Sequence, residues 1–137
     1  MELEALADRL ALDRQVHFLG WQANVPAIIA NLDFLVLPSR SEGLGLVILE
    51  GLAQARPTIG SRVGGIQEII RDGYNGLLVS PGDAAELAQA ITHLLENPDL
   101  TRQLGERGRR DLADNFSIEA MVKQTEQVYR TALADPI

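Results

Sequence analysis

The sequence predicts an α/β fold with a mostly parallel sheet, and three observations support this. The apolar run in "DFLVLPS" shows no alternation, which indicates a strand buried on both faces. Residues 83–95 carry apolar side chains at helical spacing, with Leu87, Ile91, Leu94 and Leu95 on one side. Strands and helices then alternate over about eighty residues, the pattern of a parallel sheet flanked by helices.

The first half of the chain contains five expected elements. Residues 2–12 place leucines at helical spacing, so a helix is expected there. A short strand follows in "QVHFLGW", closed by Gly20. A short helix in "NVPAIIANL" has Asn24 as its N-cap and Pro26 in its first turn. The apolar strand in "DFLVLPS" stops at Pro38, and a helix is expected over 45–55.

The second half is expected to supply two strands and three long helices. The strands lie in "PTIGS" and "GLLVS", separated by "RVGGIQEIIRDGYN", which has room for one or two helical turns. Helices are expected over 83–95, 98–114 and 117–133. Ser117 opens an imperfect capping box, because Ala120 stands in the position of the usual glutamate. We expect the last helix to pack on its own domain.

Composition excludes several classes of protein. The 137 residues are 46% hydrophobic and 23% charged, which is typical of one globular domain. The net charge of −7 argues against a surface that holds nucleic acid. Cysteine is absent, so disulfides and thiolate metal sites are excluded. No metal-binding spacing such as H-E-x-x-H is present. We expect a single domain over residues 1–137 and no cofactor.

No apolar run approaches the ~20 residues of a membrane-spanning helix. The acidic start "MELEALADRL" lacks the pattern of a signal peptide. We therefore expect a cytoplasmic protein, with peripheral attachment to a membrane as an alternative for the full-length protein.

The stretch "SRSEGLGLVILEGL" is a candidate anion site. It follows an expected parallel strand, and ligands of such sheets bind beyond the carboxyl ends of the strands. Gly43 and Gly45 let the main chain turn and approach a ligand closely. The amides from Leu44 to Val47 lie at a helix start, where the dipole favours an anion such as a diphosphate.

A carboxylate lies on each side of this candidate anion site. Glu42 precedes the helix and Glu50 lies one turn inside it. Carboxylates accept hydrogen bonds from hydroxyl groups, which suits the diols of a sugar or a ribose. A nucleotide sugar has the matching groups in the same order: the hydroxyls of the sugar, the diphosphate and the hydroxyls of the ribose. The simpler alternative is that each glutamate is a cap or a partner of the helix dipole.

The motifs around this stretch resemble a known family. In order, the chain shows Pro-Ser, E-G-x-G, E-x7-E, V-G-G-x-x-E, D-G-x-x-G-x-L-V and P-G-D. It resembles the C-terminal, donor-binding half of retaining glycosyltransferases with the two-domain GT-B architecture, often called family 4 or group 1. The resemblance extends from the first helix to Tyr129 and implies a Rossmann-like parallel sheet that is incomplete here.

The resemblance implies a role for each matching residue. Donor-sugar contacts would come from Glu42, Gly43, Leu44 and Gly45. Leu46 and Val47 would offer amides to the diphosphate, and Glu50 would bind the ribose. Further contacts to the base or the rim of the site would come from Gly20, Trp21, Gly64, Gly65 and Glu68. For the last three, a tight turn and a helix-start glutamate are an equal alternative. Trp21 also fits a half-buried loop aromatic.

The implied donor is a UDP-, GDP- or ADP-sugar, used without an obligatory metal. Three positions depart from the family pattern, although none is an implied ligand contact: Arg56 replaces glycine, Gly51 replaces alanine and Gln67 replaces proline. The family's diphosphate-neutralising arginine and lysine, and its N-terminal domain, have no counterpart here. We therefore expect weak donor binding and no catalysis by this chain alone.

The resemblance places two further strands between "VHFLG" and "DFLVLP", and these are absent from the chain. Unpaired strand edges seek partners. Three outcomes are open: the two strands pair directly, a second copy fills the gap in a homodimer, or a missing N-terminal GT-B domain belongs to a longer polypeptide. A non-catalytic nucleotide-binding or oligomerisation module therefore remains the alternative function. No nucleic-acid partner is expected.

Overall fold

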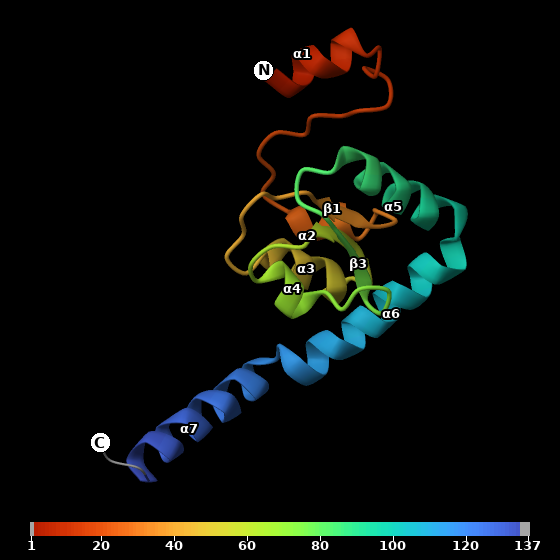
Figure 1. The fold of residues 1–137 in the computed structure, drawn as a ribbon. Helices are drawn as coiled ribbons and strands as arrows, with labels where there is room; N and C mark the ends of the chain where they lie inside the picture. The colour runs from red at the N-terminus through yellow and green to blue at the C-terminus, as the bar shows by residue number, and fades with distance from the viewer. Residues whose placement is uncertain (1, 135–137) are drawn as a thin grey trace.

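A three-stranded parallel sheet lies at the centre of the protein, between helices (Figure 1). The computed structural model describes residues 2–134. The strands β1 (Leu35–Leu37), β2 (Thr58–Ser61) and β3 (Gly76–Val79) are neighbours in that order. The helices are α1 (Glu2–Arg9), α2 (Val25–Ile29), α3 (Leu46–Ala53), α4 (Ile66–Ile69), α5 (Ala84–Glu96), α6 (Pro98–Asn115) and α7 (Ile118–Ala134). The predicted α/β class with a parallel sheet is confirmed.

Two apolar clusters hold the helices against opposite faces of the sheet. The first joins α3 and α4 to β3 through buried residues that include Ile48, Leu52 and Ile66. The second joins α5 and α6 to β2 and β3 through Ile59, Val79, Leu94 and Leu104. Because neighbouring strands are parallel, their carboxyl ends lie at one edge, and the loops that follow β1, β2 and β3 gather there.

Several helix starts form as the sequence predicts. The Asn24 side chain accepts a hydrogen bond from the Ala27 amide at 3.2 Å, and Pro26 lies in the first turn of α2. The Asp83 carboxylate accepts from the amides of Ala85 and Glu86 at the start of α5. The Ser117 hydroxyl accepts from the Ala120 amide at 3.1 Å, which is the half of the capping box that the sequence retains.

A buried asparagine fixes the loop before β3. The Asn75 side chain accepts from the Arg71 amide at 2.8 Å and donates to the Ile69 carbonyl at 3.0 Å. It also donates to the Asp111 carboxylate on α6 at 3.1 Å. Asp111 pairs with Arg71, and this side-chain hydrogen bond raises the pKa of Arg71 above its usual value. The Arg71 guanidinium also lies 4.1 Å from the centre of the Tyr74 ring.

Asn75→Ala is expected to lower the free energy of unfolding by about 3 kcal/mol, because it leaves a partly buried amide and a buried carbonyl without their partner. Urea unfolding measures this change. Asn115→Ala, at an exposed asparagine of α6, is the matched control and should change stability by less than about 0.5 kcal/mol. Equal stability of the two variants would show that the Asn75 network contributes nothing.

The prediction of a strand in "QVHFLGW" is wrong. Residues 15–21 form no strand, and all of them are exposed. A strand exists only where its amides and carbonyls pair with a neighbour, and no described segment lies beside this one to pair with it. Direct pairing between this segment and β1 is therefore also excluded for the described residues.

The prediction that β1 is buried on both faces is also wrong. Val36 at its centre is 38% exposed, and the strand lies at the edge of the sheet. Helix α3 covers one face, through contacts such as that between Leu35 and Gly51. On the other face α5 packs over β2 and β3 and leaves Val36 partly uncovered. Strand β1 is therefore fully covered by a helix on one face only, whereas its unbroken apolar sequence predicts a covering layer on both faces.

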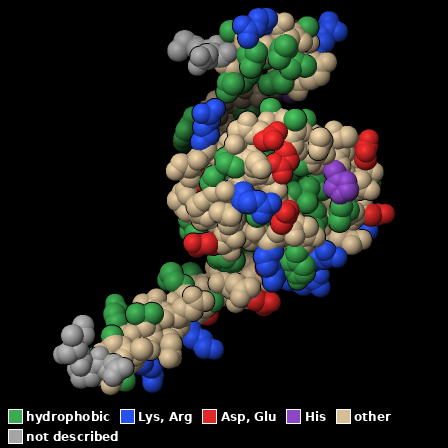
Figure 2. Space-filling view, viewed as in Figure 1, with side chains coloured by type: hydrophobic (Ala, Val, Ile, Leu, Met, Phe, Trp, Pro, Cys, Tyr) green, Lys and Arg blue, Asp and Glu red, His purple; other side chains and the backbone are tan. Residues whose placement is uncertain are grey.

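The last helix does not pack on its own domain, contrary to the prediction. Helix α7 projects from the body and contains no buried residue (Figure 1). Its large apolar residues, among them Met121, Val128 and Tyr129, are more than half exposed. Figure 2 shows hydrophobic side chains along both α1 and α7, away from the body. Within the described residues, no helix is long and apolar enough to cross a membrane.

Candidate functional site

The loop between β1 and α3, residues 38–45, lies at the carboxyl edge of the sheet. Gly45 is the N-cap of α3 and has a φ of +74°, a conformation that favours glycine. A Cβ at this position would also lie 3.0 Å from the Ile48 side chain. The prediction that a glycine makes the sharp turn into this helix is confirmed.

The loop between β2 and α4 lies directly against the first loop. The Gly65 amide donates to the Gly43 carbonyl at 3.0 Å. A Cβ on Gly64 would lie 2.0 Å from the Glu42 carbonyl oxygen, and one on Gly65 would lie 2.1 Å from that of Gly43. Only glycines allow this approach. The structure therefore brings the predicted residues 42–45 and 64–65 into one edge site.

The Glu42 carboxylate is held at this edge by its own loop. It accepts from the Gly43 amide at 3.2 Å and faces the Ser39 hydroxyl at 3.4 Å. Its Cγ lies 3.5 Å from the position that a Cβ of Gly45 would occupy, so the side chain lies beside the start of α3. A carboxylate has about four acceptor positions. Two further hydroxyl donors can therefore bind to it.

The first amides of α3 supply the positive end of the site. The Ile48 amide donates to the Gly45 carbonyl at 2.8 Å. The amides of Leu46 and Val47 precede it and have no acceptor inside the helix. They and the helix dipole favour an anion. Leu46, the first residue of this helix, is 64% exposed.

The remaining predicted residues lie outside the two loops of the edge site. Glu50 is exposed, one turn inside α3. Glu68 is in the first turn of α4, as a dipole partner would be. Gly20 and Trp21 lie in the segment 15–21, which forms no strand. Trp21 is 87% exposed, so the prediction of a half-buried aromatic is wrong. The structure does not bring Gly20 and Trp21 into a pocket with the other residues.

Two cavities were not predicted from the sequence, and neither includes Glu42 or Glu50. The smaller, about 180 Å³, lies at the carboxyl edge and includes Ser61 and Ser80. Ser61 ends β2, and Ser80 follows β3. Polar residues at the carboxyl ends of neighbouring parallel strands are the sequence signal that could have revealed this cavity. Among the described residues, no cluster of three His, Asp or Glu side chains could hold a metal ion.

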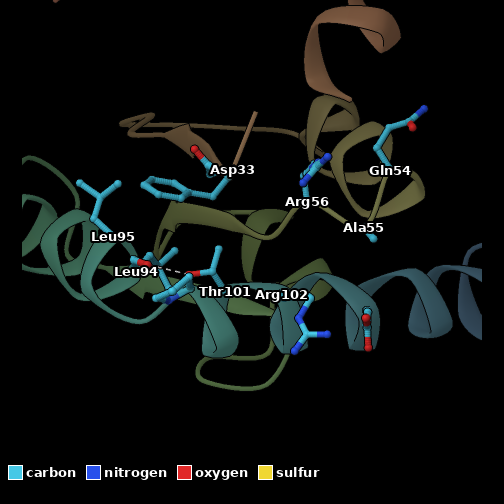
Figure 3. Close-up of a pocket in the computed structure, with 11 residues that line it drawn as sticks. Asp33, Gln54, Ala55, Arg56, Leu94, Leu95, Thr101 and Arg102 are labelled. Carbon is cyan, nitrogen blue, oxygen red and sulfur yellow. Dashed lines mark hydrogen bonds between the residues drawn. The ribbon is translucent and has the colours of Figure 1, made fainter. Parts of the chain in front are cut away.

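The larger cavity, about 450 Å³, lies at the opposite, amino end of the strands (Figure 3). It is bounded by the turn between α3 and β2 and by the turn between α5 and α6. Within it, the Thr101 hydroxyl donates to the Leu94 carbonyl at 2.8 Å. Arg56, which departs from the family pattern, donates to the Ala30 carbonyl at 2.6 Å and so attaches the end of α2 to this turn.

Comparison with known proteins gives consistent matches. The family described as glycosyl transferases group 1 matches residues 1–97. N-acetyl-alpha-D-glucosaminyl L-malate synthase of Bacillus anthracis is 40% identical over 130 residues, which are 95% of this chain and 34% of that protein. The chain thus spans about a third of the length of such relatives.

Solved structures show the same architecture. HepE of Anabaena, in complex with UDP, has a TM-score of 0.88 and 28% identity, over 95% of this chain and 36% of HepE. Sucrose-phosphate synthase of Thermosynechococcus elongatus has a TM-score of 0.84 and 36% identity, over 96% of this chain and 34% of the synthase. With its three-stranded parallel sheet and the family match over residues 1–97, the chain belongs to the group 1 glycosyltransferases and has part of their GT-B fold.

Proposed function

We propose that this chain is the donor-binding domain of a retaining glycosyltransferase, which transfers a sugar from a nucleotide sugar to an acceptor hydroxyl. The observation that carries the proposal is the edge site itself: the start of α3, closed on one side by Glu42 and followed one turn later by Glu50. The UDP complex of the similar protein HepE supports a uridine diphosphate sugar as the donor.

The chemistry of the site fits the parts of such a donor. The diphosphate would lie against the amides of Leu46 and Val47, where the helix dipole stabilises its charge. Glu42 would accept hydrogen bonds from hydroxyls of the transferred sugar, and Glu50 from the ribose. When the sugar leaves, negative charge grows on the diphosphate, and amides that are already oriented stabilise it without reorganisation. The acceptor site and catalysis would belong to the remainder of a longer enzyme.

Calorimetric titration with UDP and with UDP-glucose tests these roles. Glu50→Ala should weaken the binding of both ligands by about tenfold, because both contain the ribose. Glu42→Ala should weaken UDP-glucose by a similar factor and leave UDP unchanged, because only the former carries the sugar. Glu96→Ala, at the exposed end of α5, is the control. Wild-type affinities in both site variants would refute the assigned roles.

A second candidate is a non-catalytic association module, and the exposed apolar residues of α1 and α7 favour it. Leu3 of α1 and Ile118 and Leu133 of α7 are each more than half exposed. Light scattering after size exclusion separates the two candidates. A monomer that binds UDP supports the donor domain, whereas a tight dimer that binds no nucleotide supports the association module.

A further inference from the structure

The two glutamates of the edge site are held differently. Glu50 is exposed, and its carboxylate accepts no hydrogen bond from a described residue. Glu42 is partly buried, and each of its two carboxylate oxygens faces a donor of its own loop. The Gly43 amide donates to Oε1 at 3.2 Å, and the Ser39 hydroxyl donates to Oε2 at 3.4 Å. Of the two glutamates, only Glu42 is therefore oriented before a ligand binds.

Ser39 connects this carboxylate to the sheet. It lies two residues after β1, whose last residue, Leu37, is paired with Gly60 of β2. The hydroxyl therefore comes from the end of a hydrogen-bonded strand, whereas Glu42 lies further along the loop. A carboxylate that is bonded to a group on a rigid element is oriented more closely than one carried by a loop alone.

The main chain at residue 42 is fixed separately, by the loop after β2. A Cβ on Gly64 would lie 2.0 Å from the Glu42 carbonyl oxygen, so the two loops touch through their main chains. The Gly65 amide donates to the next carbonyl, that of Gly43, at 3.0 Å. With the main chain held in this way, the remaining freedom of Glu42 is rotation about its side-chain bonds. The hydrogen bonds to Oε1 and Oε2 restrict this rotation.

We propose that Ser39 is a positioning residue, which orients the Glu42 carboxylate for the hydroxyls of the donor sugar. Immobilising a flexible side chain during binding costs affinity, and a carboxylate that is already oriented avoids part of this cost. The Ser39 hydroxyl occupies one acceptor position of Oε2 and the Gly43 amide one of Oε1. Each oxygen keeps a second position for a sugar hydroxyl. This inference rests on the proposed function, since it needs Glu42 to bind the sugar.

Calorimetric titration of the chain with UDP and UDP-glucose tests the proposal. Ser39→Ala should weaken UDP-glucose binding by about threefold to tenfold, the cost of immobilising one flexible side chain, and leave UDP binding unchanged. Ser41→Ala is the matched control, because Ser41 belongs to the same loop, is exposed and makes no side-chain hydrogen bond to a described residue. This control should leave both affinities unchanged.

A double variant tests whether Ser39 acts through Glu42. In that case, Ser39→Ala should weaken UDP-glucose binding no further when it is added to Glu42→Ala. A full additional loss in the double variant would show that Ser39 acts independently of the carboxylate, and the positioning role would be refuted.

The remaining outcomes separate this inference from the proposed function. If Glu42→Ala weakens UDP-glucose binding and Ser39→Ala does not, the positioning role is refuted and the donor domain stands. If Ser39→Ala weakens UDP and UDP-glucose equally, Ser39 only maintains the loop, and the positioning role is again refuted. If neither ligand binds to the wild-type chain, the proposed function fails and the positioning role fails with it.

Discussion

Gly65→Ala is expected to destabilise the protein and to disrupt the edge site in one step. A Cβ at residue 65 would lie 2.1 Å from the Gly43 carbonyl oxygen and 2.8 Å from the Leu44 Cα. These are main-chain atoms, which cannot rotate away as the end of a side chain can. The φ of Gly65 is −65°, which alanine adopts freely, so the effect would come from the steric contact alone.

We expect Gly65→Ala to lower the free energy of unfolding by about 2–3 kcal/mol, a typical cost of overpacking. The loop that carries Glu42 must move away, so UDP-glucose binding should fall by at least about tenfold. Urea unfolding and calorimetry measure the two effects. Gly43→Ala is the stability control from the opposite loop, because no atom lies within 4 Å of its added Cβ. If Gly65→Ala unfolds at the same urea concentration as the wild type, the contact between the loops is not tight.

The parts of the fold that local chemistry determines could be predicted from the sequence. Asn24, Asp83 and Ser117 cap their helices through their own side chains, whatever lies around them. The strands β2 and β3 are short segments bounded by turn residues, and both are paired in the sheet. The glycine at residue 45 could also be predicted, because a sharp turn into a helix needs it.

The parts that depend on distant partners could not be predicted. The apolar residues of 15–21 read as a strand, but a strand also needs a neighbour for its backbone, and none is described there. The apolar pattern of α7 shows that one face suits a partner without showing where the partner is. The cavity at Ser61 depends on the distance between α5 and the end of β2, which no sequence pattern contains.

Gly105→Ala tests how helix α6 supports the site from a distance. Gly105 is buried in α6, and a Cβ there would lie 2.0 Å from the Ala55 carbonyl oxygen and 3.1 Å from Pro57. Ala55 belongs to the turn that ends α3, where the Arg56 amide donates to the Gly51 carbonyl at 2.8 Å. Helix α6 can therefore lie against this turn only if residue 105 has no side chain.

Two opposing effects decide the result for Gly105→Ala. Alanine favours a helix over glycine by about 1 kcal/mol, which would stabilise α6. The contact with a main-chain carbonyl requires α6 and the turn to separate, which opens the apolar clusters on either side and costs about 3–5 kcal/mol. The net expectation is a loss of about 2–4 kcal/mol, measured by urea unfolding.

Gln103→Ala, at an exposed residue of the same helix, controls for helix propensity and should change stability by less than about 0.5 kcal/mol. Because the turn at Ala55 ends the helix whose first amides form the proposed anion site, separation of α6 should also weaken UDP binding in the folded variant. A Gly105→Ala protein that is more stable than the wild type would show that the helix propensity of alanine outweighs the contact with the Ala55 carbonyl. It would also show that the turn at the end of α3 can shift without loss of stability.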